Sequence, residues 1–288
     1  TQDLCLQAMI SESLIFYALV LLATGIAVGF FCGLLGVGGG FLVVPVEIWL
    51  LSLQGVEATM ATRIAFATSL AVVLPTAISG CRKHSCWGVV LWQEGVIIGL
   101  FGMLGGFLGG TIASYAPGEL LRMIFGIIVI LAAARMLFVP HFQTWQEPHK
   151  RPKKSIIHYM IWGVAVGVLS GLTGIGGGLM LVPIMIIALG FNLYQAIGTS
   201  SVAISFNALG GITAYAINGW GLEGLPSYCL GYIDLLQFLL LAAGSILAAP
   251  WGAKIAHRLP ADRLKHIFVI LMFYIGLKMI GAIEWAGL

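Results

Sequence analysis

The sequence predicts an all-α integral membrane protein with about ten transmembrane segments (8–10), arranged in two inverted-topology repeats with glycine-broken helices. Three observations predict this fold class: the apolar composition, a motif that occurs twice, and the distribution of basic residues among the loops. Of the 288 residues, 60% are hydrophobic and only 9% are charged. Soluble domains carry about 25% charged residues, so most of this surface must face lipid, where the backbone has to be helical.

Apolar runs follow one another along the chain, and most reach the roughly 20 residues that a membrane core requires. The runs at 41–53 and 179–190 are shorter, and each follows a glycine cluster. Each is expected to be a half-helix or a broken span, and the sequence leaves open whether it crosses fully. Residues 140–156 form a long polar stretch, which predicts a cytoplasmic basic linker there. It divides the chain into a first transmembrane half at 1–139 and a second at 157–288.

An internal repeat organises the chain. Residues 25–45 are GIAVGFFCGLLGVGGGFLVVP and residues 163–183 are GVAVGVLSGLTGIGGGLMLVP, with 12 of 21 positions identical. Further along, a Thr-Ser pair at 68–69 aligns with a second at 199–200. Matches that keep the same order in both halves indicate a gene duplication.

The basic residues predict the orientation of the two halves. The loops at 81–87, 140–156 and 253–266 contain ten of the fourteen Lys and Arg residues, which predicts that they are cytoplasmic. The basic loop at 81–87 has a repeat partner at 218–231 that is not basic. Conversely, the loop at 114–120 is not basic, whereas its repeat partner at 253–266 is. The asymmetry changes sign between the halves, so we expect opposite orientations and an odd number of crossings per half. The chain is expected to be a multi-pass protein of a bacterial inner (plasma) membrane.

The glycine clusters are the candidate binding elements. Three consecutive glycines permit positive φ, and the helix that starts after them presents unpaired N–H groups and the positive end of its dipole. Two such helix starts that approach the midplane from opposite faces would form an anion clamp. The alternative is close helix packing. The glycines concerned are Gly36, Gly38, Gly39, Gly40, Gly174, Gly176, Gly177 and Gly178.

Polar side chains in the following helices are further candidates for substrate binding. Thr68, Ser69, Thr199 and Ser200 occupy matched positions, and their hydroxyls either donate to anion oxygens or bond to carbonyls of their own helix. Asn207 lies two turns beyond the second pair, where an amide in hydrocarbon either joins helices or contacts substrate.

Two charged residues lie inside apolar runs, where an ionisable group is a functional hypothesis. Arg63 precedes Thr68 by five residues; it either attracts an oxyanion or extends to the membrane interface. Glu47 follows Pro45, and its repeat partner is Met185. The carboxyl is a candidate for coupling: it takes a proton, pairs with Arg63, or caps a short helix near water.

Several function classes lack sequence support. HExxH, GxSxG and paired-carboxylate motifs are missing, and the five cysteines have no metal-ligand spacing. We therefore expect no enzymatic activity, no cofactor and no metal site. Nucleic acid is not an expected partner because no basic face or recognition motif is present.

The two segments GLLGVGGGFLVVP and GLTGIGGGLMLVP, each followed by a Thr-Ser pair, resemble the duplicated signature of the sulfite exporter TauE/SafE family. The resemblance covers about 14–285 and implies transport of sulfite, sulfoacetate or another organosulfonate. It implies a binding role for the matching glycines and for Thr68, Ser69, Thr199 and Ser200. Arg63 and the longer 219–231 loop lie outside the shared pattern.

The sequence therefore predicts a secondary transporter that exports a small sulfur-containing anion through a midplane site at the repeat interface. With the cytoplasm negative, export of one negative charge is favoured by about 2.3 kcal/mol per 100 mV and needs no coupling ion. The alternatives are an importer of a similar anion coupled to protons or sodium, with Glu47 as the coupling residue, and a membrane scaffold or assembly factor that transports nothing. The identity of the anion and the oligomeric state stay open.

Overall fold

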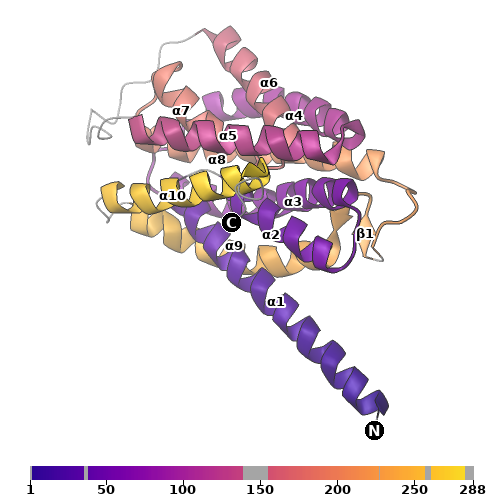
Figure 1. Cartoon of the computed structure of the whole chain (residues 1–288). Helices are drawn as coiled ribbons and strands as arrows, with labels where there is room; N and C mark the ends of the chain where they lie inside the picture. Colours follow the sequence, from indigo (N-terminus) through magenta and orange to yellow (C-terminus); the bar gives the residue numbers. More distant parts are fainter. Residues whose placement is uncertain (1, 36–37, 139–154, 227, 257–260, 283–288) are drawn as a thin grey trace.

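The computed structural model describes residues 2–35, 38–138, 155–226, 228–256 and 261–282. Gly36, most of the linker at 140–156 and part of the 253–266 loop lie outside these residues. Within them the chain forms ten helices and one antiparallel strand pair (Figure 1). The elements are α1 (Gln2–Leu35), α2 (Gly40–Leu53), α3 (Ala58–Ser85), α4 (Trp92–Tyr115), α5 (Gly118–Phe138), α6 (Ile156–Thr173), α7 (Gly178–Ile187), α8 (Leu193–Asn218), β1 (Cys229–Leu230), β2 (Ile233–Asp234), α9 (Leu235–Ala256) and α10 (Ala261–Met279).

The helices have the length and apolarity of membrane spans. Seven of those described, α1, α3, α4, α5, α6, α8 and α9, are long and apolar enough to cross a membrane, and α10 is apolar over Val269–Met279. The chain is thus an all-α multi-pass membrane protein. Helices α2 and α7 have 14 and 10 residues. At 1.5 Å per residue they are about 21 and 15 Å long, so neither crosses a core of about 30 Å by itself.

Each short helix folds back along the long helix before it. Phe191, just after α7, contacts Tyr159 near the start of α6, with ring centroids 6.2 Å apart. In the first half, Gln54, which follows α2, lines the same cavity as Tyr17 of α1. The pairs α1–α2 and α6–α7 are therefore hairpins, and the glycine clusters form their turns inside the bundle.

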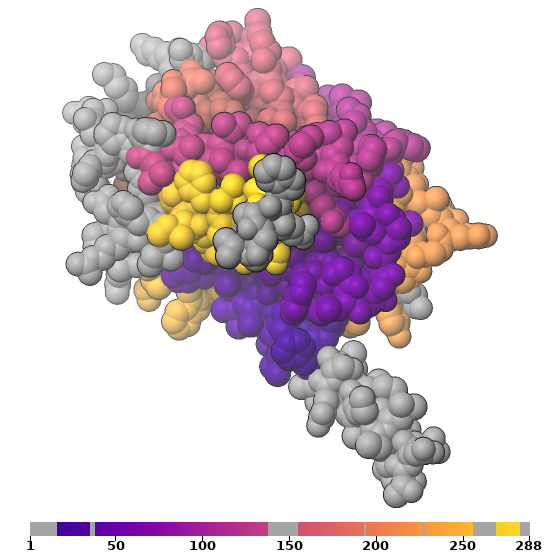
Figure 2. Space-filling view, in the orientation of Figure 1, coloured from indigo at the N-terminus to yellow at the C-terminus, as the bar shows by residue number. Residues whose placement is uncertain are grey.

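The two halves interlock. Helix α1 packs on α9, α6 packs on α4, and the matched helices α3 and α8 pack on each other in the centre. The apolar segments of α3 and α8 are 78% and 61% buried, against 39–44% in the other long helices. Figure 2 shows another matched pair, α5 and α10, side by side on one face. Every main contact thus has a counterpart in the other half.

The central helices run in opposite directions. Arg63, near the start of α3, contacts Tyr232, whose backbone N–H bonds to Tyr215 near the end of α8. His84, near the end of α3, lies beside Gly198 near the start of α8. Because α3 and α8 are repeat partners, this antiparallel packing supports the predicted inversion of the halves, which stays a prediction with respect to the membrane.

Candidate functional site

The glycine turns adopt positive φ angles, which residues with a side chain rarely adopt. Gly38 and Gly39 have φ of 85° and 70°, and the matched Gly176 and Gly177 have 85° and 82°. Gly39 and Gly177 are the N-cap residues of α2 and α7. Since residues with a Cβ are disfavoured at such φ by roughly 1–2 kcal/mol, glycine lets each chain reverse and begin a new helix within the bundle.

The two turns meet at mid-depth. A Cβ on Gly38 would lie 3.6 Å from Val73 and 3.7 Å from Ile204, and one on Gly176 would face the same two side chains. Val73 and Ile204 lie near the middle of α3 and α8. A Cβ on Gly40 would be 2.7 Å from the carbonyl oxygen of Gly174, so the turns are in contact. Two helix N-termini, each with partial positive charge, therefore point into the centre of the protein from opposite directions.

The matched threonines bond to the starts of two other helices. The Thr68 hydroxyl accepts a hydrogen bond from the backbone N–H of Asp234 at 2.9 Å. The Thr199 hydroxyl accepts one from the backbone N–H of Leu91 at 3.0 Å. Asp234 precedes α9 and Leu91 caps α4, so the two bonds are repeat equivalents that fix the beginnings of α9 and α4.

The serines beside them differ. The Ser69 hydroxyl donates to the carbonyl of Gly174 at 2.8 Å and so connects α3 to the turn of the other half. The Ser200 hydroxyl donates to the Ile197 carbonyl of its own helix at 2.9 Å. All four predicted hydroxyls thus have backbone partners, but only that of Ser69 bonds to a glycine turn; contact between them and substrate stays a prediction.

Asn207 and Ser170 are the unpartnered polar groups beside the second turn. Both are fully buried, and the side-chain nitrogen and oxygen of Asn207 and the Ser170 hydroxyl have no hydrogen-bond partner among the described residues. A Cβ on Gly177 would lie 3.2 Å from the Asn207 nitrogen and 3.3 Å from the Ser170 Cβ. The Asn207 nitrogen and Ser170 therefore lie beside the N-terminus of α7, whereas the Asn207 oxygen lies against Gly102 of α4. Sequence reasoning missed Ser170 because its repeat partner is Cys32, an apolar small residue.

Arg63 lies away from the turns. Its guanidinium donates to the Ala116 carbonyl at 3.0 Å and to the Tyr232 hydroxyl at 3.3 Å. These contacts join α3 to the α4–α5 connection and to the strand pair. The Nε atom is buried and has no hydrogen-bond partner in the part of the chain that the structure describes. The predicted attraction of substrate stays a prediction.

Glu47 is fully buried in α2, and both carboxylate oxygens lack a hydrogen-bond partner within the described chain. The hypothesis that Glu47 pairs with Arg63 is therefore not supported. Asp234 is close enough for its charge to act on Glu47. Sequence reasoning missed Asp234, which is separated from Glu47 by most of the chain and resembles an ordinary residue before a helix.

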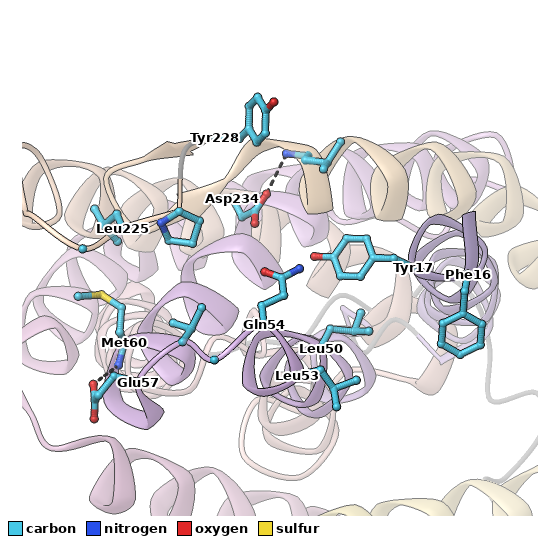
Figure 3. A pocket seen from close by; sticks show the side chains of 15 residues that line it. Phe16, Tyr17, Leu50, Leu53, Gln54, Glu57, Met60, Leu225, Tyr228 and Asp234 are labelled. Carbon is cyan, nitrogen blue, oxygen red and sulfur yellow. Dashed lines mark hydrogen bonds between the residues drawn. The ribbon is translucent and has the colours of Figure 1, made fainter. Parts of the chain in front are cut away.

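Asp234 lines a cavity of about 1070 Å³, here called the outer cavity. The cavity lies between α1, the end of α2, the start of α3 and the loop before β1, and Figure 3 shows the Tyr17 hydroxyl and the Gln54 amide pointing toward each other below Asp234. In Figure 1, β1 lies at the end of the bundle opposite to the start of α10. That is the end that the basic loops predict to be outside the cell.

Comparison with known proteins agrees with this architecture. The family model described as sulfite exporter TauE/SafE matches residues 21–279. A probable membrane transporter protein of Haemophilus influenzae is 30% identical over 263 residues, 91% of this chain and 98% of that protein. Probable membrane transporter proteins of Methanocaldococcus jannaschii (28% identical; 92% and 97% covered) and Bacillus subtilis (25%; 91% and 96%) are also similar over nearly their full length. No solved structure matches the chain.

Proposed function

Because the chain belongs to the sulfite exporter TauE/SafE family, a family of membrane transporters, we propose that it is a secondary transporter of a small sulfur-containing anion. Sulfite and organosulfonates such as sulfoacetate are the proposed substrates. The proposed site lies at the repeat interface, where the turns of the two hairpins meet.

The observation that carries the proposal is the environment of the α7 N-terminus. Backbone N–H groups at a helix start favour an anion without any formal positive charge nearby. The amide of Asn207 and the hydroxyl of Ser170 add side-chain donors without partners. Buried polar groups are normally hydrogen-bonded, so the two donors without a partner among the described residues, the Asn207 nitrogen and the Ser170 hydroxyl, suit a ligand with acceptor oxygens, such as a sulfonate. A scaffold protein would have no need for these groups.

The site is closed in this conformation because Gly40 packs against Gly174. Access from either side therefore requires the hairpin turns to separate. Rocking of one repeat against the other around a midplane site is the usual motion of inverted-repeat transporters. Ser69, which bonds one half to the turn of the other, would lose its partner in that motion.

The direction of transport depends on coupling. Uncoupled export of an anion is favoured by the membrane potential, about 2.3 kcal/mol per 100 mV and unit charge. Import needs a coupled cation. The unpartnered, fully buried Glu47 beside Asp234 favours this second candidate.

Counterflow exchange in proteoliposomes tests the proposal without assuming a driving force. Labelled sulfite and a short sulfonate should exchange, whereas chloride and an amino acid should not. Gly177→Ala should lower exchange at least about tenfold, equivalent to about 1.4 kcal/mol, because the new Cβ contacts Val166 and Asn207.

Gly190→Ala is the matched control. Gly190 also has a positive φ, 78°, but a Cβ there would meet nothing within 4 Å. The control therefore carries the same backbone strain and should keep its exchange. Exchange of no anion by the wild-type protein, under any ion gradient, would refute the proposed function and favour a scaffold.

A further inference from the structure

The outer cavity leads from the surface to Asp234. Glu57 also lines the cavity and is exposed, whereas Asp234 is only 6% exposed. Glu47 is outside the lining and fully buried, but close enough to Asp234 for the two charges to interact. Tyr17 and Gln54 lie on the same wall, and the charges of Asp234 and Glu47 both act on the Tyr17 hydroxyl. A cavity that is lined by the carboxylates of Glu57 and Asp234 does not suit an anionic substrate, but it does suit a cation.

The two buried carboxyl groups have unequal surroundings. Asp234 accepts hydrogen bonds from the backbone N–H groups of Leu236 and Gln237 at 2.9 and 3.0 Å, and from the Gln237 side chain at 3.0 Å. Three donors suit a charged carboxylate. Glu47 accepts none. A buried carboxylate without donors or a positive partner is strongly disfavoured, and a negative neighbour adds to the cost.

The other nearby groups do not neutralise this pair. Tyr17 on α1 and Cys229 on β1 are the further ionisable groups that interact with the acids. Burial raises the pKa of the Cys229 thiol to about 12, so it stays neutral at physiological pH. Two cations lie at this end of α3: Arg63 donates to Ala116 and Tyr232, and Arg122 of α5 donates to Thr62 and Ala58. Among the described residues, Glu47 therefore has no hydrogen-bond donor or ion-pair partner that could balance its charge.

We propose that Glu47 and Asp234 share one proton, taken up from the outer cavity, and that this proton moves together with the transported anion. In the closed conformation Glu47 carries the proton and Asp234 keeps its hydrogen bonds. Binding transfers a proton from water to a Glu47 oxygen, and release on the other side of the cycle returns it to water. Co-transport of one proton with a monovalent anion moves no net charge.

The inference rests on the proposed anion transport and deepens its coupled form. The acidic pair, one residue from each half, has no acidic counterpart at the repeat-equivalent positions, because the repeat partners of Glu47 and Asp234 are Met185 and Leu91. A single proton site would therefore serve the single polar anion site at α7. Gln237 is fully buried beside Asp234, and its side-chain oxygen has no hydrogen-bond partner among the described residues. This oxygen could accept a hydrogen bond from the protonated carboxyl group.

The first experiment measures proton movement with the wild-type protein. Proteoliposomes with a trapped pH dye receive ethanesulfonate outside, with the sulfonate ionised at every pH used. Internal acidification that follows the anion supports the proposal. If the medium outside is more acidic by one pH unit, co-transport of one proton per anion should drive about tenfold accumulation of the sulfonate inside. An imposed membrane potential should change this accumulation little.

Variants then assign the proton site. Glu47→Gln and Asp234→Asn should both lose accumulation driven by the pH gradient while keeping counterflow exchange, which needs no net proton movement. Glu57 is an acid that lines the same cavity. The control variant Glu57→Gln should keep both counterflow exchange and accumulation driven by the pH gradient. Size-exclusion profiles verify folding, and the dye measurement on the wild-type protein stands if a variant fails to fold.

Three results would overturn the proposal. Exchange without proton movement or response to a pH gradient would leave anion transport intact and remove the proton. Accumulation driven by a sodium gradient instead would make the acids a sodium site. Full proton-driven accumulation by both variants would place the proton elsewhere. Absence of wild-type exchange would refute the underlying function, and that result is distinct from the other three.

Discussion

The two hairpins share a backbone but differ in the side chains around their turns. At the α7 turn, Ser170 and Asn207 are buried without partners. The equivalent residues at the α2 turn are Cys32 and Thr76. The Thr76 hydroxyl lies 2.6 Å from the Ser245 hydroxyl, so this side is already satisfied. Both hairpins thus have a helix start with a positive dipole end, but among the described residues the unpartnered polar side chains lie beside the α7 turn and not beside the α2 turn.

The acidic residues show the reverse asymmetry. The first half places Glu47 on its short helix, and Asp234 approaches it from the start of α9, whereas the matched positions are apolar. The protein therefore combines a nearly symmetric scaffold with two different polar sites. The symmetry suits a motion that exchanges the roles of the halves, and we propose that the differences divide the tasks, with the anion at the α7 hairpin and the proton at Glu47 and Asp234. The variants below test this division.

The largest effect is expected at Asn207. Asn207→Asp keeps the size of the side chain but adds a negative charge beside the α7 N-terminus. An anion would then meet repulsion at the helix start that otherwise attracts it, so exchange should fall at least about tenfold, a change of 1.4 kcal/mol or more. Initial rates of labelled ethanesulfonate exchange provide the measurement.

Asn218→Asp is the control for this charge. Asn218 ends the same helix and is bonded to the Ala214 carbonyl at 2.8 Å, far along α8 from the turn. Its exchange rate should remain near that of the wild-type protein. Equal rates for the two variants would mean that the α7 turn does not contact the anion, and the division between the hairpins would fail.

Arg63 is the next test, because its repeat partner, Tyr194, is uncharged. Arg63→Ala removes donors from the Ala116 carbonyl and the Tyr232 hydroxyl, so we expect a loss of about 2–3 kcal/mol in stability. Arg82→Ala, at the exposed other end of α3, should change it little. Thermal unfolding in detergent measures both. A raised KM with unchanged stability would instead assign Arg63 to substrate attraction.

Ser69 tests the bond between the halves. Ser69→Ala leaves the buried Gly174 carbonyl without this donor, and the expected loss of stability is about 1 kcal/mol. Ser79→Ala is matched: it lies on the same helix and donates to the Ile246 carbonyl at 3.1 Å, but is exposed. Its effect should be smaller. If both variants unfold at the same temperature, Ser69 does not stabilise contact between the turns.

Much of the fold was predictable because the repeat preserves its glycines. Gly38–Gly40 and Gly176–Gly178 predicted broken helices, and both clusters form the expected turns. The lengths of the apolar runs did not decide whether the two short segments cross the membrane. Helix α7 ends at Ile187, and tertiary contacts such as that of Tyr159 with Phe191 reveal that the chain turns back.

The site was predictable in part. Asn207 stood out as an amide in an apolar helix. Ser170 did not, because a serine is ordinary at a close helix contact. Asp234 required knowledge of the fold: its proximity to Glu47 comes from packing of β2 against α3 and of α2 against α3, contacts that no local pattern encodes. The hydroxyls of Thr68 and Thr199 were recognised as a matched pair, but their backbone partners depend on the starts of α9 and α4.

The smallest effect is expected where the central helices begin. Glu57 caps α3, and Asn192 caps α8. Hydrogen bonds from the backbone N–H groups of Thr59 and Met60 lower the pKa of Glu57. The carboxylate therefore contributes stability above its unfolded pKa, near 4.5, and this contribution is lost as the pH falls through the lower folded value. The side chain of Asn192 has no proton to gain over this pH range.

Thermal unfolding followed between neutral and acidic pH should show a small acid destabilisation that Glu57→Gln reduces and Asn192→Ser does not. An unchanged acid slope in Glu57→Gln would mean that the cap of α3 is as insensitive to pH as the cap of α8, so this difference between the halves would have no energetic consequence.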